Sequence, residues 1–318
     1  MTVVVGILNT KGAAIAADSA VTRQVAKLLP NGNITDKKEK IVNSGNKMLR
    51  ISDIMPIGVM VVNNASLLDV PWDVIIRWYR KQHGETTYAT VEELVVDFLD
   101  FIPKQEFFIK NAFTRNWPYP TELVFTGYGI DQKYPQLVHL RIRGVENCKL
   151  IYTTKDVQIH NITEENPSLI LSFGQKDIVA TLTEDMTENS DVNMLYDQIS
   201  MIFSKIVMKL INKGILKSEQ ANYVGYAKEI IPILSNYHKE ERSKWEKSVK
   251  DYSLQQMAAL AENLVNATEL HRQITFEEEH VGGLIDLAII TKADGFQWLN
   301  RKSWYYPSRG GQYGKFGV

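Results

Sequence analysis

The pattern of apolar residues at the start of the chain predicts a β-hairpin. Residues 3–8 (VVVGIL) and 13–17 (AAIAA) are typical of strands, and the segment NTKG at 9–12 between them is a turn signal. If the chain folds back at this turn, the numbers of paired residues sum to about 20 or 21, because antiparallel partners run in opposite directions. Asp18 then lies beside Thr2, where the first strand begins. In a simpler interpretation of the same pattern, Asp18 only caps a turn.

A second pair of strands is expected after a polar stretch. Residues 33–46 are rich in Asn, Asp, Lys and Gly and predict a loop, whereas the segment KMLRISDIMPIGVMVV that follows predicts two short strands. Period-two alternation puts Lys47 on one face with Leu49 and Ile51. A buried ammonium is costly unless it is paired, so Lys47 needs an acidic partner, and Asp18 is a candidate. The alternative is a lysine at a strand end that extends to solvent.

The remaining pattern predicts alternating groups of helices and strands. Thr90 and Glu93 form a capping-box pattern before one helix, and Ser253 caps another. The order of strands, helices, strands, helices and strands suits two stacked sheets that are flanked by helices. The expected helices span 67–82, 94–102, 193–212 and 253–271, and the expected strands span 122–129, 136–143, 284–291 and 296–299.

Composition and charge narrow the function classes. The 318 residues are 44% hydrophobic and 23% charged, which is ordinary for a globular protein with a large core. A net charge of −1 gives no reason to expect nucleic acid or an anionic membrane as a partner. The single cysteine, Cys148, excludes an internal disulfide, and no apolar run reaches the roughly 20 residues of a membrane helix. Because the first residues also lack the features of a signal peptide, we expect a cytoplasmic protein.

The sequence lacks the motifs that would indicate a metal or a cofactor. It contains no glycine-rich phosphate loop and no cysteine cluster, and its six histidines lack ligand spacing. Glu277 and His280 form one pair just before a strand, which is a weak metal signal. We therefore expect neither a metal nor a cofactor.

Three residues indicate a chemistry if they converge. Removal of Met1 would leave Thr2 with a free α-amine, which can act as the general base for the hydroxyl of the same residue. An α-amino group titrates near pH ~8, so much of it is neutral with little tuning. A nearby Lys47 would depress the pKa of the amine further and stabilise the deprotonated hydroxyl, with Asp18 as its partner.

Six segments of the sequence match the pattern of one known family. They are TVVVGILNTKGAAIAADSAVT, KMLRI, PIGVMVVNNASLLD, ELVFTGYGIDQKYPQLVHLRI, LSFGQKDIVATL and VGGLIDLAIITKADGFQWL. In that order they resemble the first hairpin, the catalytic-lysine strand, the next strand with its helix start, the central hairpin, a strand-to-helix junction and the closing hairpin of β-type proteasome subunits. The bacterial relatives HslV and Anbu belong to the same superfamily of N-terminal-nucleophile (Ntn) hydrolases. The resemblance leaves out most of residues 184–275.

The resemblance implies a fold. It implies an α+β protein built as a four-layer αββα sandwich of two antiparallel sheets, in a single domain over residues 1–303. Residues 184–275 would be an enlarged helical region, about three times longer than the outer helix pair that the family leads us to expect. This charge-rich region is interpreted either as a solvated face or as an added element that contacts a partner or narrows access to the site. Residues 304–318 are expected to be a flexible C-terminal tail.

The resemblance also assigns roles to residues of this chain. Thr2 would be the nucleophile, with Asp18 and Lys47 completing the catalytic group. The family's oxyanion glycine falls at Val62 or Asn63, whose backbone could still donate. A departure is Val281, which stands where the family has a hydroxyl and cannot replace its hydrogen bond. Supporting positions would be Gln175, Glu278, Gly282 and Gly283.

The function implied by the resemblance is that of a threonine-type peptidase. It would hydrolyse peptide or unfolded-protein substrates as a homo-oligomeric ring. The resemblance leaves open whether an ATP-dependent unfoldase is its partner. One alternative keeps the fold and replaces the peptide by a non-peptide amide, because fold does not fix function. A second alternative is a non-catalytic assembly or scaffold subunit, which retention of Met1 would favour because the amine of Thr2 would then be blocked.

Overall fold

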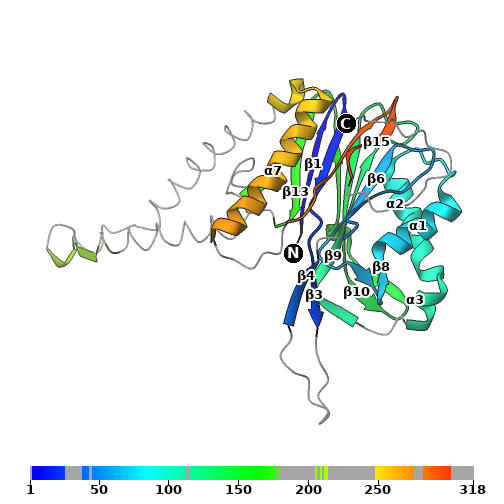
Figure 1. The fold of residues 1–318 in the computed structure, drawn as a ribbon, viewed down its shortest axis with the longest axis horizontal. Coiled ribbons are helices and arrows are strands. Elements are labelled where there is room, and N and C mark those ends of the chain that lie inside the picture. Colours follow the sequence, from blue (N-terminus) through cyan, green and yellow to red (C-terminus); the bar gives the residue numbers. More distant parts are fainter. Residues whose placement is uncertain are drawn as a thin grey trace, which may run out of the picture.

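The computed structural model describes residues 2–25, 38–42, 45–111, 115–175, 178–179, 205, 208–209, 211–213, 248–275 and 282–301. Most of the expected helix at 193–212, most of the 184–275 region and the whole 304–318 tail lie outside these residues. Within the described residues the chain forms two main antiparallel sheets and several helices (Figure 1). The expected mixed α and β class with antiparallel sheets is therefore confirmed.

The first sheet combines four strands from the two ends of the chain with one strand, β13, from its middle. Its five strands lie in the order β13 (Ser168–Gly174), β1 (Val3–Asn9), β2 (Gly12–Ala17), β14 (Asp286–Thr291) and β15 (Gly295–Asn300), and all neighbours are antiparallel. In the hairpin of β1 and β2, Val4 pairs with Ala17 and Asn9 with Gly12, so the partner numbers sum to 21. The predicted register is confirmed, and Asp18 follows β2 directly beside the start of β1.

The second sheet comes from the middle of the chain. Its path runs β11 (Lys149–Ile151), β10 (Gln136–Glu146), β9 (Arg115–Gly127), β6 (Ile57–Val62) and β5 (Met48–Arg50), and β12 (Val157–Asn161) also pairs with β10. All of these pairs are antiparallel. The expected strand at 136–143 thus falls within β10, and the one at 122–129 overlaps β9, which starts earlier and ends at Gly127.

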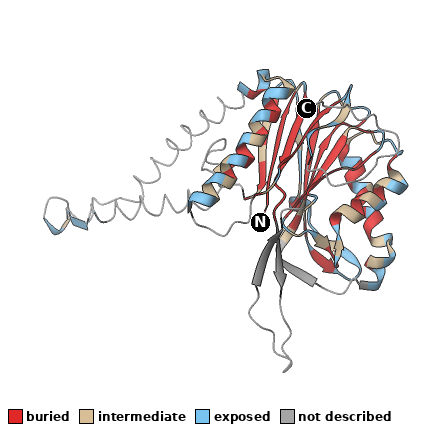
Figure 2. Cartoon of the chain, viewed as in Figure 1, coloured by how far each residue is buried: buried red, intermediate tan, exposed pale blue. Residues whose placement is uncertain are grey.

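An apolar core joins the two sheets face to face. It contains Val4 and Ile15 of the first sheet and Met60, Val124 and Leu137 of the second, all of them buried. The red strands at the centre of Figure 2 show this burial on both sheets.

Helix α7 (Leu254–Thr275) covers the outer face of the first sheet. Its buried residues Met257, Ala261 and Val265 join one core cluster with apolar side chains of β1 and β2. Ser253 caps it as expected, because its hydroxyl accepts a hydrogen bond from the N–H of Gln256 at 3.3 Å while the Gln256 side chain accepts one from the N–H of Ser253 at 2.8 Å. The reciprocal bonds fix the point at which the helix starts.

Three further α-helices of the described residues lie on the outer face of the second sheet. They are α1 (Trp72–His83), α2 (Val91–Phe101) and α3 (Glu106–Asn111), with the short 3₁₀ helix η1 (Ile102–Lys104) between the last two. Trp72, Leu94 and Phe98 of these helices share a buried cluster with Phe125 of β9. Thr90 caps α2 by accepting the N–H of Glu93, but the Glu93 side chain accepts from Ala89 and not from Thr90. No helix within the described residues is long and apolar enough to span a membrane.

The structure corrects two expectations about local structure. Residues 33–46, predicted as a loop, include β4 (Lys38–Val42), which pairs with β3 (Val21–Val25) in a ribbon that projects from the sheets in Figure 1. The sequence KEKIV carries little of the apolar alternation that predicts strands, so pattern alone misses it. The helix predicted from residue 67 starts only at Trp72, because β7 (Ser66–Leu67) and β8 (Val70–Pro71) form a short turn there.

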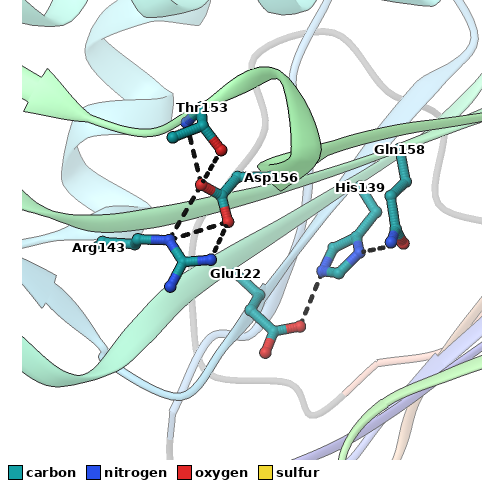
Figure 3. A network of polar contacts seen from close by, with 6 residues as sticks. All are labelled: Glu122, His139, Arg143, Thr153, Asp156 and Gln158. Carbon is teal, nitrogen blue, oxygen red and sulfur yellow. Dashed lines mark hydrogen bonds and ion pairs between the residues drawn. The ribbon is translucent and has the colours of Figure 1, made fainter.

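An ion pair between the exposed Arg143 and the buried Asp156 fastens the 3₁₀ helix η2 (Thr154–Asp156) to β10 (Figure 3). The guanidinium of Arg143 donates to both carboxylate oxygens of Asp156, with Nε at 3.0 Å from each and Nη2 at 2.6 Å from Oδ1. The N–H and hydroxyl of Thr153 donate to Oδ2 at 2.9 and 2.8 Å. These hydrogen bonds lower the pKa of Asp156 to about 2, and those from Arg143 make the largest contribution.

We expect Asp156→Asn to lower stability in a pH-dependent way. Because the pKa of Asp156 is lower in the folded chain than in the unfolded chain, its carboxylate stabilises the fold above about pH 4, and this contribution is lost as the pH falls toward about 2. The substitution should therefore cost about 1–2 kcal/mol at neutral pH and progressively less below about pH 4. Urea midpoints measured over this pH range test this.

The matched control is Glu164→Gln, which breaks the exposed pair of Glu164 with Lys133. An exposed pair contributes little, so the control should leave the midpoint unchanged. A pH-independent loss in Asp156→Asn would show that its charge is not the cause.

Candidate functional site

Thr2, Asp18 and Lys47 lie at one end of the stacked sheets. Thr2 immediately precedes β1, and Asp18 immediately follows β2. Lys47 precedes β5, and its carbonyl accepts the N–H of Val61 at 2.7 Å, which extends the pairing of β5 with β6 by one bond. All three side chains belong to buried residues.

Lys47 and Asp18 form a buried ion pair between the two sheets. The Lys47 Nζ lies 2.7 Å from the Asp18 Oδ1, and the two side chains are 7% and 1% exposed. Removing two charges from water costs several kcal/mol per ion in real proteins, so such a pair requires good geometry and further hydrogen bonds.

Backbone N–H groups supply those further hydrogen bonds to Asp18. Its Oδ1 accepts the N–H of Val3 at 3.0 Å, and its Oδ2 accepts the N–H groups of Ala20 at 3.2 Å and Gly282 at 3.3 Å. With the ammonium of Lys47, the carboxylate thus receives four donors. The Oδ1 atom that holds Lys47 also holds the amide that follows Thr2 in the chain.

Lys47 does not share a face with Leu49 and Ile51 as predicted. Leu49 and Ile51, predicted to share its face, belong to the core beneath α1 and α2, whereas Met48 belongs to the core between the sheets. Lys47 nevertheless reaches Asp18 of the first sheet. The reason is that β5 begins only at Met48, so the two-residue period of the strand does not set the direction of the Lys47 side chain.

The start of β1 is held from the other side by the end of β13. The N–H of Gln175 donates to the Thr2 carbonyl oxygen at 2.8 Å. Gly174 has φ +81°, and a Cβ on it would lie 2.0 Å from the same oxygen, so only glycine allows this approach. Gln175, whose side chain is buried, thus touches Thr2 through its backbone.

Val62 and Asn63 lie at the same end, where β6 stops. The Val62 Cγ1 lies 3.1 Å from the point that a Cβ on Gly174 would occupy, so Val62 faces the β13 segment that carries the Thr2 hydrogen bond. Asn63 is exposed and has φ +67°, a left-handed conformation that asparagine tolerates better than most residues. Its Nδ2 donates to the Pro120 carbonyl at 3.1 Å and to Glu122 Oε1 at 3.2 Å.

The glycine pair before β14 touches the site through its backbone. Besides the bond from Gly282 to Asp18, the Gly282 carbonyl accepts the N–H of Ser19 at 3.2 Å. Gly283 has φ +83°, in the region that favours glycine. Glu278 and Val281 lie outside the described residues, so the structure gives them no place.

Sequence reasoning missed a polar pair near this end. His139 of β10 and Glu122 of β9 join through Nε2 and Oε2 at 2.8 Å, and Gln158 of β12 lies at the other ring nitrogen of His139 at 3.2 Å (Figure 3). A signal existed, because these polar residues interrupt apolar alternation in two strands that were predicted. Among the described residues no group of three or more His, Cys, Asp or Glu side chains could hold a metal ion.

Comparisons with known proteins give only distant likenesses. No family model matches the sequence, and no curated protein matches it. Among solved structures, the chain is similar to Anbu (ancestral beta-subunit) from Yersinia bercovieri, with a TM-score of 0.44 and 10% identity over 95% of this chain and 88% of that chain. It is also similar to an Anbu (Gly-1) mutant from Hyphomicrobium sp. strain MC1, with a TM-score of 0.44 and 12% identity over 95% and 86% of the two chains. These likenesses are too distant to carry an argument about activity.

Proposed function

We propose that this chain is a threonine-type hydrolase of the N-terminal-nucleophile class that cleaves peptide bonds, with Thr2 as its nucleophile after removal of Met1. The observation that carries the proposal is the buried pair of Lys47 and Asp18. Asp18 Oδ1 binds both the Lys47 ammonium and the N–H of Val3, so a positive charge is held close to the peptide that follows Thr2.

Stability alone is a poor reason for such a pair. Replacing a buried ion pair by apolar residues of similar volume is often neutral or stabilising, so the pair gives little net stability. A cation held in a water-excluded place does, however, lower the free energy of negative charge that develops nearby. It also lowers the pKa of a neighbouring amine through like-charge repulsion. Both effects favour a threonine hydroxyl that is activated by its own amine.

The proposed reaction has two steps. In the first, the Thr2 oxygen attacks the substrate carbonyl while its proton moves to the α-amine of Thr2, directly or through one water. The tetrahedral intermediate then collapses, the C–N bond breaks, and the leaving amine takes that proton. In the second step the Thr2 amine removes a proton from water, the water oxygen attacks the ester, and the acid product leaves as Thr2 recovers its hydroxyl proton.

The arrangement of the layers supports the same proposal. Helix α7, the two face-to-face sheets and helices α1 to α3 suit the four-layer αββα sandwich of the N-terminal-nucleophile hydrolases. The backbone N–H of Gln175 supplies one fixed donor to Thr2, where the resemblance leads us to expect a hydroxyl-bearing residue. A panel of fluorogenic peptides against simple acyl amides distinguishes a peptidase from an amidase on the same fold.

We expect Lys47→Met to lower peptide turnover by at least ~10²-fold, the low end for loss of one electrostatic catalytic group. Because the substitution also leaves Asp18 without its cation, a second variant separates activity from stability. In Lys47→Met with Asp18→Asn both charges are gone, so thermal stability should recover in part while activity stays low. Turnover and melting temperature are measured for both variants.

Lys133→Met is the matched control, because Lys133 pairs with Glu164 on the exposed surface. It should turn over peptides like the wild type. Activity that returns in the double variant together with stability would show that the pair is only structural.

Thr2→Ala should abolish covalent labelling by a β-lactone or epoxyketone probe, whereas Thr2→Ser should retain it, because serine keeps the hydroxyl and the amine. Thr10→Ala, in the turn between β1 and β2, serves as a threonine control that should label normally. Intact mass spectrometry reads the adduct. Labelling of Thr2→Ala at the wild-type rate would rule out Thr2 as the nucleophile.

Self-association into a homo-oligomeric ring is part of the proposal and rests on the sequence resemblance. We expect sedimentation at micromolar concentration to give a species larger than the monomer. A monomer at every concentration would contradict the proposed ring but would not bear on the proposed role of Thr2 as the nucleophile.

A further inference from the structure

A row of four polar side chains crosses the second sheet and ends at the candidate site. Gln158 of β12 lies 3.2 Å from Nδ1 of His139 on β10, and His139 Nε2 lies 2.8 Å from Oε2 of Glu122 on β9. The other oxygen of Glu122 accepts Nδ2 of Asn63 at 3.2 Å. Figure 3 shows the first three side chains pointing toward one another from neighbouring strands. We call these four residues the Glu122 row.

His139, in the middle of the Glu122 row, lies between the two sheets, where apolar side chains would be expected, whereas Gln158 and Asn63 at the two ends of the row are exposed. The His139 side chain is 1% exposed, and its ring centroid lies 4.5 Å from that of Phe173 on β13 of the first sheet. Leu137 and Val124, two residues away along β10 and β9, belong to the core between the sheets. A carboxylate and an imidazole in such a place cost free energy unless they are bonded to each other, so packing alone does not explain them.

The row ends at a constrained backbone position. Asn63 has φ +67°, and its exposed side chain is tied to β9 by its bonds to Glu122 and to the Pro120 carbonyl. Both bonds come from one amide group, so they fix the direction of the side chain and with it the turn that follows β6. Removing the Glu122 acceptor takes away one of the two hydrogen bonds that hold the Asn63 amide to β9.

The same turn borders Thr2 and Lys47. Val62, next to Asn63, faces Gly174 beside the Thr2 carbonyl, and Val61 is hydrogen-bonded to the carbonyl of Lys47. A small rotation at Asn63 therefore re-aims the backbone N–H groups at the end of β6. Donors to an oxyanion act only when they are already aimed at the place where the charge develops.

We propose that Glu122 and His139 are positioning residues for the reaction: they hold the Asn63 turn so that its backbone N–H faces the oxyanion formed when Thr2 attacks. The inference rests on the proposed function of Thr2. His139 fixes the Glu122 carboxylate, and Glu122 fixes the Asn63 amide. The half-buried Arg141, directly opposite Glu122 in the pairing of β9 with β10, is the described cation nearest in register to the row.

The test uses the kinetics of covalent labelling by a β-lactone on the full chain. The oxyanion forms in the bond-making step, so a misplaced donor lowers the maximal labelling rate, kinact, and leaves the probe's KI unchanged. We expect Glu122→Leu to lower kinact at least ~10-fold, below the 10²–10³-fold loss typical of deleting an oxyanion donor. Glu122→Gln keeps an acceptor for Asn63 and should restore most of kinact. Asn63 is exposed, so Asn63→Ala should disturb folding less than Glu122→Leu does. It should lower kinact and leave KI unchanged.

A double-mutant cycle identifies the route of the effect. If Glu122 acts through Asn63, adding Glu122→Leu to Asn63→Ala should lower kinact no further. Asp156→Asn is the matched control, because it breaks a polar contact of β10, that of Arg143 with Asp156, which does not lead to Asn63. It should leave kinact as in the wild type at a temperature where all variants are folded.

Three results would overturn the inference. They are an unchanged kinact in folded Glu122→Leu and Asn63→Ala, losses in the two that add independently, or an equal loss in the Asp156→Asn control. Failure of the wild type to label at Thr2 would instead refute the proposed function itself and the catalytic role of the row with it. Hydrogen exchange of the segment around Asn63 then reports separately whether Glu122→Leu loosens the turn.

Discussion

One buried carboxylate, that of Asp18, organises the end of the molecule at which β1 begins. It accepts the backbone N–H groups of Val3, Ala20 and Gly282 and the ammonium of Lys47. These donors belong to the start of β1, the connection to β3, the approach to β14 and the approach to β5, so four chain segments meet at one negative charge. Because the opposite charge is buried beside it, neither member of the pair can be removed without leaving the other unpaired in a dry place. The geometry around the first residues of β1 is thus set before any substrate arrives.

Local sequence signals predicted much of the frame that carries this carboxylate. The register of β1 with β2 follows from one turn between two apolar runs, and the caps Thr90 and Ser253 lie where the sequence put them. The failures have physical causes. β4 pairs with β3 in a ribbon whose sequence lacks apolar alternation, and α1 starts late because Pro71 ends a short turn immediately before it. Each of these features depends on backbone pairing or backbone torsion angles that an apolar pattern does not encode.

The sequence predicted the part of the candidate site in which one buried charged residue requires an oppositely charged partner. A lysine in an apolar strand needs a carboxylate, and the hairpin register brings Asp18 to the right end, although the strand parity assumed for Lys47 was wrong. The Glu122 row could not be assembled in this way. Its members come from β12, β10, β9 and the turn after β6, and their meeting requires the registers of three strand pairs at once. In the sequence, Glu122 and His139 are only two polar residues in apolar strands. Their contact with each other, and that of Glu122 with Asn63, is visible only in the folded structure.

The central claim is that Thr2 works with its own amine beside Lys47, and it depends on the covalent state of the first residue. The most direct measurement is the intact mass of the purified wild-type chain, together with its N-terminal sequence. We predict a chain that lacks Met1 and begins at Thr2, since small residues such as threonine in the second position permit removal of the initiator methionine. Retention of Met1 on the wild-type chain would contradict the account, because the Thr2 nitrogen would then be an amide and could not serve as a base. The buried pair of Lys47 and Asp18 would in that case belong to a scaffold subunit and not to an enzyme.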